Sequence, residues 1–252
     1  MEIDENLYKA LCTGRIYVQK DEKGNVIATN TEDPSFYTRR DTDIFWYDHR
    51  YYQKIETVSG IDLYDDVSKQ IMDRAAGCYS KEALSAYVFA HQEETPFFLA
   101  VCDIDNFKCV NDTYGHHCGD LVIQKIGTLF STFVGESGLA CRWGGDEFVL
   151  IIPLKDQDKL EKIQSAVASE IFPLNSPITI TVGITKFKKG DKIEKAIQRA
   201  DTSLYNGKKL GRNIAVMDGT IDTTRIKPKV YRLKKDIDYR NLMEKTVKSS
   251  KG

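Results

Sequence analysis

The stretch Arg142-Trp143-Gly144-Gly145-Asp146-Glu147-Phe148 sets two glycines and two acids between the strand-like runs 139–142 and 148–153. Paired glycines allow a sharp hairpin turn and let backbone amides approach a ligand closely. Adjacent carboxylates repel each other, and a nearby cation relieves that repulsion. The stretch therefore predicts a β-hairpin whose tip carries an acidic pair suited to a cation.

A second group of acids follows an apolar run earlier in the chain. The run Phe97-Phe-Leu-Ala-Val-Cys102 is typical of a strand buried on both faces, and Asp103-Ile104-Asp105 comes directly after it. Because side chains alternate along a strand, we expect Ile104 in the core, Asp103 on the opposite face and the Ile104 carbonyl beside that carboxylate. If the hairpin pairs with this strand, the two acidic groups form an oxygen-lined site of the kind that Mg²⁺ prefers.

A third motif lies on a predicted helix over residues 193–209, with Gly211 as its C-terminal stop. Asp201, Tyr205, Lys208 and Arg212 recur at spacings of three and four residues, which places them on one helical face. We expect Lys208 and Arg212, one turn apart, to hold phosphate groups while Asp201 packs inward. An exposed Lys/Arg pair taken alone is more often solvated surface.

Composition limits the class of protein. The chain has 252 residues, a formal net charge of −1 and 41% hydrophobic residues, so it can bury a core and does not attract nucleic acid or anionic lipid as a whole. Its apolar runs are shorter than the ~18 residues of a membrane helix, and its acidic amino terminus does not resemble a secretory signal. We therefore expect a cytoplasmic protein without membrane or nucleic-acid partners. Six cysteines without a C-x-x-C pair are predicted to be reduced packing residues: Cys12, Cys78, Cys102, Cys109, Cys118 and Cys141.

Three segments of the chain differ in composition and in predicted secondary structure. Residues 1–64 are predicted to be a small strand-rich regulatory segment, with a hairpin that turns at Gly24-Asn25. Residues 65–217 alternate helical and strand patterns and open with a predicted linker helix from Asp65 to about Arg74. Residues 218–252 form a basic extension that is either solvated or in contact with phosphates or a partner.

The three motifs together resemble GGDEF-domain diguanylate cyclases, which join two GTP molecules into cyclic di-GMP. Residues 144–148 match the signature of that family, residues 103–120 resemble its first strand and nucleotide loop, and residues 200–213 resemble its closing helix. The resemblance covers about residues 73–217. It implies an α/β fold with a palm-like (nucleotidyl cyclase or ferredoxin-like) central sheet flanked by helices.

The resemblance also implies the role of each site residue. Asp103, the Ile104 carbonyl and Asp146 would bind two Mg²⁺ ions per active site, with Mn²⁺ as an alternative. Asp146 and Glu147 would help deprotonate the ribose 3′-hydroxyl, and Lys108 would neutralise phosphate charge. The remaining residues would bind GTP, through phosphate, guanine or the pocket wall: Asn106, Phe107, Asn111, His116, Asp120, Gly145, Lys208 and Arg212. Each domain would hold one GTP, so catalysis would require a homodimer.

Several positions depart from the family pattern. The opening motif keeps Asp73 and Gly77 but loses an Asn-Arg pair, and Gly207 replaces an alanine at a cost of ~1 kcal/mol in helix propensity. The charges of the product-inhibition motif would fall on Gly135 and Gly138, so we expect no such feedback site. The amino-terminal segment is faintly similar to the end of a PAS sensor, as a truncated PAS-like unit would be.

Three other functions compete with the cyclase. One is a catalytically silent GGDEF module that binds GTP or a partner, and the intact acids argue against it. Another is a related metal-dependent cyclase acting on a different nucleotide, against which Asn111 and Asp120 argue. The third is a nucleic-acid adaptor that uses the basic extension, and the overall charge argues against that.

Overall fold

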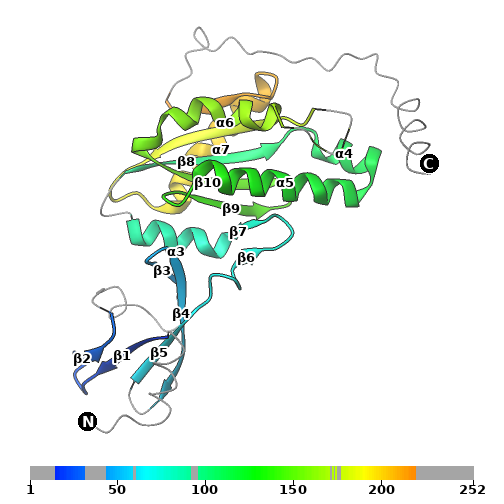
Figure 1. The fold of residues 1–252 in the computed structure, drawn as a ribbon. Coiled ribbons are helices and arrows are strands. Elements are labelled where there is room, and N and C mark those ends of the chain that lie inside the picture. The colour runs from blue at the N-terminus through cyan, green and yellow to red at the C-terminus, as the bar shows by residue number, and fades with distance from the viewer. Residues whose placement is uncertain are drawn as a thin grey trace, which may run out of the picture.

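The computed structural model describes residues 15–31, 44–58, 61–91, 96–170, 172, 174 and 177–219. These residues form a five-stranded sheet near the amino terminus and a seven-stranded sheet in the rest of the chain (Figure 1). Among the helices of these residues, none combines the length and the hydropathy that a bilayer-spanning helix requires. The basic extension predicted from residue 218 lies almost wholly outside the described residues, as does Cys12.

The amino-terminal sheet is antiparallel, with strand order β2-β1-β5-β4-β3. Its strands are β1 (Ile16–Lys20), β2 (Val26–Thr29), β3 (Phe45–Tyr47), β4 (Arg50–Val58) and β5 (Ile61–Asp66). The predicted first hairpin is confirmed. Its turn is held by the Asp21 carboxylate, which accepts hydrogen bonds of 2.8 Å from the amides of Lys23 and Asn25. Gly24 supplies the positive φ, 83°, that the turn requires.

The linker helix predicted from Asp65 to about Arg74 is wrong. The backbone closes a single turn, in which the Ile71 amide donates to the Val67 carbonyl at 3.1 Å, and then enters strand β6 (Met72–Asp73). Other polar groups of this segment form hydrogen bonds with Tyr51 of β4 and not with one another as in a helix. The Val67 amide donates to Tyr51, and the Ser68 hydroxyl accepts from the Tyr51 amide at 2.8 Å. The apolar residues that suggested a helix, Val67 and Ile71, are instead buried in a hydrophobic core on one face of the seven-stranded sheet.

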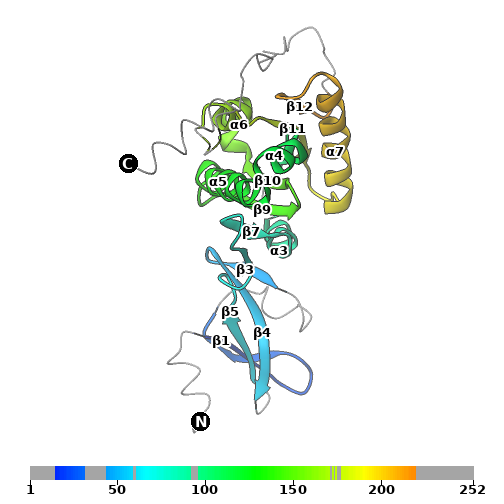
Figure 2. The same ribbon diagram turned by 90° about the vertical axis from the view of Figure 1, so that its right-hand side faces the viewer.

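The larger sheet has the strand order β12-β11-β8-β10-β9-β7-β6 and mixes parallel and antiparallel pairs. Its remaining strands are β7 (Cys78–Ser80), β8 (Phe97–Ile104), β9 (Leu139–Gly144), β10 (Glu147–Pro153), β11 (Ile180–Phe187) and β12 (Ala215–Met217). The helices are α3 (Lys81–His91), α4 (Phe107–Tyr114), α5 (His116–Val134), α6 (Asp158–Ala168) and α7 (Ile193–Lys209), with a 3₁₀ turn η1 (Leu154–Asp156). Figure 2 shows α5 and α6 on one face of the sheet and α3 and α7 on the other. The predicted α/β fold with a central sheet flanked by helices is confirmed.

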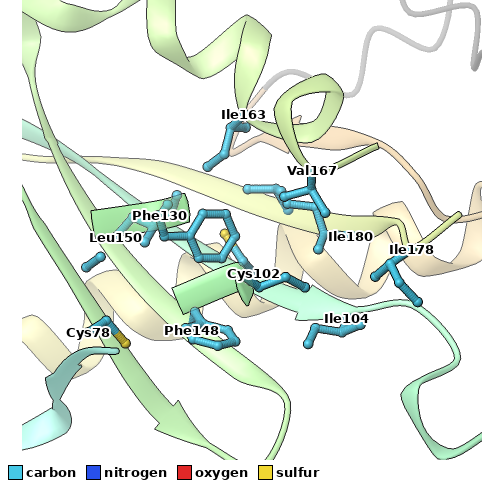
Figure 3. Close-up of a cluster of buried hydrophobic side chains, with 14 of the residues drawn as sticks. Cys78, Cys102, Ile104, Phe130, Phe148, Leu150, Ile163, Val167, Ile178 and Ile180 are labelled. Carbon is cyan, nitrogen blue, oxygen red and sulfur yellow. The ribbon is translucent and has the colours of Figure 1, made fainter. Parts of the chain in front are cut away.

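Strand β8 lies inside the sheet and is buried on both faces, as its continuous apolar run predicts. Phe98, Ala100, Cys102 and Ile104 belong to the core beneath α5 and α6, part of which Figure 3 shows. The alternate residues 97, 99 and 101 belong to the core beneath α3 and α7. Asp103 continues this second set, so its side chain emerges on the α7 face of the sheet.

The cysteines of the described chain behave as the sequence predicts. Cys78, Cys102 and Cys141 are buried, and none of the five described cysteines forms a disulfide. Burial raises the pKa of the Cys78 thiol to about 12. These buried thiols are therefore packing groups and not reactive nucleophiles.

Helix α3 connects the two sheets. It buries Ala83, Leu84, Ala86, Tyr87 and Val88 against the larger sheet, at the spacing of a helical face. At its end, the His91 ring lies 4.5 Å from the ring of Trp46, which belongs to β3 of the amino-terminal sheet. Trp46 therefore joins the amino-terminal sheet to the α/β domain.

Helix α7 crosses β11 at close range, and Gly207 makes this possible. A Cβ atom at Gly207 would lie 2.7 Å from Cγ2 of Thr181 and 3.2 Å from Cγ2 of Ile214. The sequence suggested that this glycine only weakens the helix. The contacts revise that interpretation, because an alanine would collide with the sheet.

Candidate active site

The Gly-Gly motif forms the hairpin that its two glycines predict. Strands β9 and β10 are joined by a tight turn in which Gly145 has a φ of 50°. Strand β10 pairs antiparallel with β8 in a register that sets Glu147 directly opposite Asp103. The Ile104 amide donates to the Asp146 carbonyl at 3.3 Å. The expectation that the hairpin pairs with the Asp103 strand is confirmed.

Lys208 from the last turn of α7 completes this cluster. Its Nζ lies 2.7 Å from Oδ2 of Asp103, although the two residues are 105 positions apart in the sequence. The side chain of Asp103 is the more buried of the two, at 13% exposure against 33% for Lys208. The ion pair therefore neutralises a carboxylate that is largely shielded from solvent.

Negative charge exceeds positive charge in this cluster. Burial raises the pKa of Asp103 above its ordinary value, and Asp146 raises it further, while Lys208 opposes the shift. Burial also raises the pKa of Glu147, with the charge of Asp103 as the next cause. The pKa of Asp201 is raised by partial burial as well. Four carboxylates thus share one ammonium group, an arrangement that favours a further cation.

Asp201 does not pack inward as the sequence suggested. Asp201 lies on α7, two turns before Lys208, and is largely exposed with its carboxyl partly shielded from solvent. Its charge nevertheless reaches the site, since Asp201 contributes to the raised pKa of Glu147.

The donor set fits a divalent cation that is shared with a substrate. In the described part of the chain, no three His, Cys, Asp or Glu side chains form a complete metal-binding cluster. Mg²⁺ seldom uses such a cluster in nucleotide enzymes, because one or two carboxylates combine with water and substrate phosphates. Asp103 at the end of β8 and Asp146 in the turn between β9 and β10 match this partial set, and the hydrogen bond from the Ile104 amide to the Asp146 carbonyl holds the two segments together.

The turn into α4 follows the same strand end. Asn106 has a φ of 57°, and α4 starts at Phe107 with Lys108 exposed beside it. The first amides of a helix lack intrahelical partners, so this N-terminus can bind an anion.

Arg212 does not share a helical face with Lys208. Helix α7 ends at Lys209, and Arg212 lies in the following turn with a φ of 65° and an exposed side chain. Its amide donates to the Gly207 carbonyl at 3.2 Å, which holds the turn against the helix end. The predicted pair therefore comes from a helix terminus and a turn.

The residues predicted to bind guanine gather at the α4–α5 corner, near the end of β8 (Figure 1). Asn111 packs against Gly119, where a Cβ atom would collide with the Asn111 side chain. His116 begins α5, and Asp120 follows in its next turn. Both side chains are exposed.

Arg142 makes contacts that the sequence did not indicate. Its Nε and Nη2 atoms donate to the Gly145 carbonyl at 2.9 and 2.7 Å, and its Nη1 lies 3.3 Å from Oδ2 of Asp73. Asp73 also caps its own turn by accepting from the Ala76 amide at 2.9 Å. The turn that enters the α/β domain is thereby bonded to the Gly-Gly hairpin.

Asp105 is the second residue that sequence reasoning missed. It is 5% exposed and accepts hydrogen bonds from Thr179, Thr181 and the amide of Asn213. The only available signal was an acid directly after a buried strand, which more often begins a turn.

Comparisons with known proteins agree with this geometry. The family model "Diguanylate cyclase, GGDEF domain" matches residues 71–214. The chain is 32% identical over 163 residues to diguanylate cyclase DgcP of Pseudomonas aeruginosa, which covers 60% of this chain and 24% of that protein. It is 33% identical over 157 residues to diguanylate cyclase VdcA of Vibrio cholerae, which covers 57% of this chain and 45% of that protein. This chain therefore matches less than half the length of either relative.

A solved structure shows the same fold. The coiled coil and GGDEF domain of DgcB from Caulobacter crescentus, crystallised with c-di-GMP, aligns with a TM-score of 0.55 and 30% identity. The alignment covers 59% of this chain and 86% of that one. The similarity thus lies in the α/β domain that carries the acidic cluster.

Proposed function

This chain belongs to the GGDEF-domain family of diguanylate cyclases, and from that premise we propose that it condenses two GTP molecules into cyclic di-GMP and two pyrophosphates. The observation that best supports this activity is the register of β8 and β10, with Glu147 opposite Asp103. That register concentrates carboxylates beside Lys208 and the N-terminus of α4. Carboxylates that attract cations, next to groups that attract phosphates, suit phosphoryl transfer.

In each of two equivalent steps, the proposed reaction forms a bond between the 3′-oxygen of one GTP and the α-phosphorus of the other. The bond from that phosphorus to the oxygen of the departing pyrophosphate breaks, and the hydroxyl proton passes to a carboxylate of the hairpin. Glu147 and Asp146 are the candidate bases. The raised pKa of Glu147 increases its proton affinity, which suits this role.

Asp103, Asp146 and the Ile104 carbonyl would hold the two Mg²⁺ ions, with Mn²⁺ as the alternative. Bound ions would offset the charge on the reacting phosphate and make the attacking hydroxyl more acidic. Lys208 neutralises Asp103 in the free chain. With a cation held by Asp103, Lys208 would be available to phosphate oxygens.

Phosphate groups would also contact Lys108, Arg212 and the amides of Asn106 and Phe107, close to the Gly145 turn. These groups flank the end of β8 on two sides, from α4 and from the turn after α7. Cations and free amides on both sides of a strand end suit a triphosphate, whose charge is spread along its length.

Guanine would bind at the α4–α5 corner, through Asn111 and Asp120, with His116 in the pocket wall. A carboxylate accepts hydrogen bonds from both N1–H and the amino group of guanine, whereas adenine presents a lone pair at N1. The exposure of Asp120 in the free chain leaves its carboxylate accessible for this contact. One such corner per chain binds one GTP, so a homodimer would bring the two substrates together.

The proposal is tested by incubating the purified protein with Mg²⁺ and equal GTP and ATP. We expect pyrophosphate and cyclic di-GMP by mass spectrometry, and no product after EDTA treatment or in Asp146→Ala. Asp158→Ala, which removes an exposed acid on α6, is the matched control and should leave turnover unchanged.

Two other outcomes would assign a different function. A dimeric preparation that binds GTP and leaves it unchanged would indicate a catalytically silent module. A cyclic product that contains adenine would indicate a cyclase with another nucleotide preference.

A further inference from the structure

Asp105 is a buried carboxylate whose hydrogen bonds come from neutral groups. Its Oδ1 accepts from the Thr181 hydroxyl at 2.6 Å, and its Oδ2 accepts from the Thr179 hydroxyl at 2.8 Å and from the Asn213 amide at 2.9 Å. A buried carboxylate is tolerated only when such bonds replace its hydration. Both oxygens are therefore engaged within the protein, which makes Asp105 a poor ligand for substrate or metal.

These bonds join three segments that are distant in sequence. Asp105 itself leads from β8 into the Asn106 turn, its threonine partners lie at the start of β11, and Asn213 directly follows Arg212. The Asp105 amide also donates to the Thr179 carbonyl at 2.9 Å. One side chain thus connects the turn at the start of α4 with the turn that carries Arg212.

The segments joined in this way adopt costly backbone conformations. Asn106, Arg212 and Asn213 have positive φ angles of 57°, 65° and 53° without being glycines. Such conformations persist only where surrounding contacts hold them, and they concentrate at functional sites. The Asp105 carboxylate provides such a contact, because it bonds the Asn213 amide and directly precedes Asn106.

We propose that Asp105 is a positioning residue for the triphosphate, which it serves by fixing Arg212 relative to the Asn106–Lys108 turn. This inference rests on the proposed function, in which phosphates bind between those two elements. Asp105 touches neither the substrate nor the reacting atoms. Loss of its bonds should therefore weaken recognition of phosphate and leave recognition of guanine unchanged.

The test measures affinity by calorimetry for two probes, GTP and guanosine, with the full chain. Asp105→Asn keeps the side-chain shape but turns an amide donor toward groups that already donate. We expect about a tenfold rise in the Kd for GTP, as for the loss of a hydrogen bond to a charged group, with the Kd for guanosine within about twofold of wild type.

Two variants of Thr181 repeat the test without altering the carboxylate. Thr181→Val removes the hydroxyl that Asp105 accepts from and should weaken GTP binding selectively, whereas Thr181→Ser keeps the hydroxyl and should restore it. Thr185→Val is the matched control, because its buried hydroxyl on the same strand bonds Asp218 instead. These variants keep the inference testable where Asp105→Asn does not fold.

The outcomes separate the inference from the proposed function. Unchanged GTP affinity in both Asp105→Asn and Thr181→Val would overturn the positioning role. Equal losses for GTP and guanosine would also overturn it, since they would indicate a general structural role. A wild-type chain that binds GTP without releasing pyrophosphate would contradict the proposed catalysis and still test Asp105 through affinity.

Discussion

At the scale of a single residue, the ionised carboxylate of Glu147 lowers the stability of the folded chain. Its carboxyl is half-buried beside Asp103, and burial followed by that charge raises its pKa above the ordinary 4.5. Between the ordinary and the raised pKa, the folded chain binds more protons than the unfolded chain. The contribution of Glu147 to the free energy of unfolding therefore falls as the pH rises through that window. At neutral pH, the ionised carboxylate destabilises the folded chain.

Glu147→Gln should raise the unfolding temperature at neutral pH while lowering cyclase activity. The gain should be about 0.5 kcal/mol, because the partial exposure of Glu147 lets solvent screen its charge. The gain should shrink as the pH is lowered toward 4.5, where the wild-type carboxyl takes up its proton. Thermal unfolding followed by circular dichroism across this pH range measures it.

Glu136→Gln, which alters an exposed acid in the turn before β9, is the control and should show no such pH-dependent gain. A wild-type chain that is more stable than Glu147→Gln at neutral pH would contradict the idea that the site is strained by its charge.

Asp120 tests base recognition at the same scale. Asp120→Ser removes the acceptor proposed for guanine N1–H, so we expect the preference for GTP over ATP to fall by about tenfold to a hundredfold. Competition between the two nucleotides for binding measures this ratio. Asp112→Ser, at an exposed position on α4, should keep the wild-type preference. If Asp120→Ser also keeps it, guanine is recognised by other residues.

At the scale of elements, the close crossing of α7 over β11 determines how near Lys208 lies to Asp103. The crossing is close because glycines occupy the contact points, Gly183 on β11 and Gly207 on α7. Thr181, which a Cβ at position 207 would strike, is itself held by its hydrogen bond to Asp105. The neighbour therefore cannot rotate away without losing that bond.

Gly207→Ala should consequently destabilise the protein by about 1–3 kcal/mol through overpacking, although helix propensity alone favours alanine by up to about 1 kcal/mol. Urea unfolding measures the change. Displacement of α7 should also weaken the Lys208–Asp103 contact and raise the KM for GTP. Thr202→Ala, at an exposed position on α7, is the control. Its effect should follow helix propensity, so this variant should not be destabilised. A stabilised Gly207→Ala would refute the close-packing interpretation.

At the scale of the whole molecule, the amino-terminal sheet touches the α/β domain through Trp46. The Trp46 ring lies 4.5 Å from the His91 ring and 5.8 Å from the Tyr87 ring, and Tyr87 donates from its hydroxyl to the Ser137 carbonyl at 2.7 Å. Within the larger sheet, Asp73 of β6 pairs with Arg142 of β9, which joins the entry of the domain to the hairpin. Regulation by the first 64 residues stays a prediction.

Trp46→Ala should loosen the joint between the two sheets. We expect a loss of about 2 kcal/mol, below that of a fully buried tryptophan because the ring is partly exposed, and faster amide exchange along α3. Hydrogen exchange with mass spectrometry measures the second effect. Trp143→Ala, which removes an exposed ring from the hairpin, should leave α3 protected. Unchanged exchange in Trp46→Ala would mean that the sheets are held together elsewhere.

The elements that were predictable from the sequence are those with strong local patterns. Helix α7 matches the predicted bounds because its amphipathic spacing is long and Gly211 interrupts it. The linker helix failed because its apolar spacing, at Val67, Ile71 and Ala75, covers little more than two turns, and pairing with Tyr51 and β7 outweighed that weak propensity. The prediction that Arg212 lies on the same helical face as Lys208 was wrong for a related reason, because residue spacing does not show where a helix ends.

The sequence by itself determined the family, the buried strand, the Gly-Gly hairpin and the face on which Asp103 emerges, because alternation and turn chemistry are local properties. Only the tertiary structure decided that Glu147 lies opposite Asp103, that Lys208 pairs with it, and that Asp105 bonds the turn after α7. These contacts join residues far apart along the chain. Their geometry follows from strand register and helix packing, which depend on the whole core and not on any single stretch of sequence.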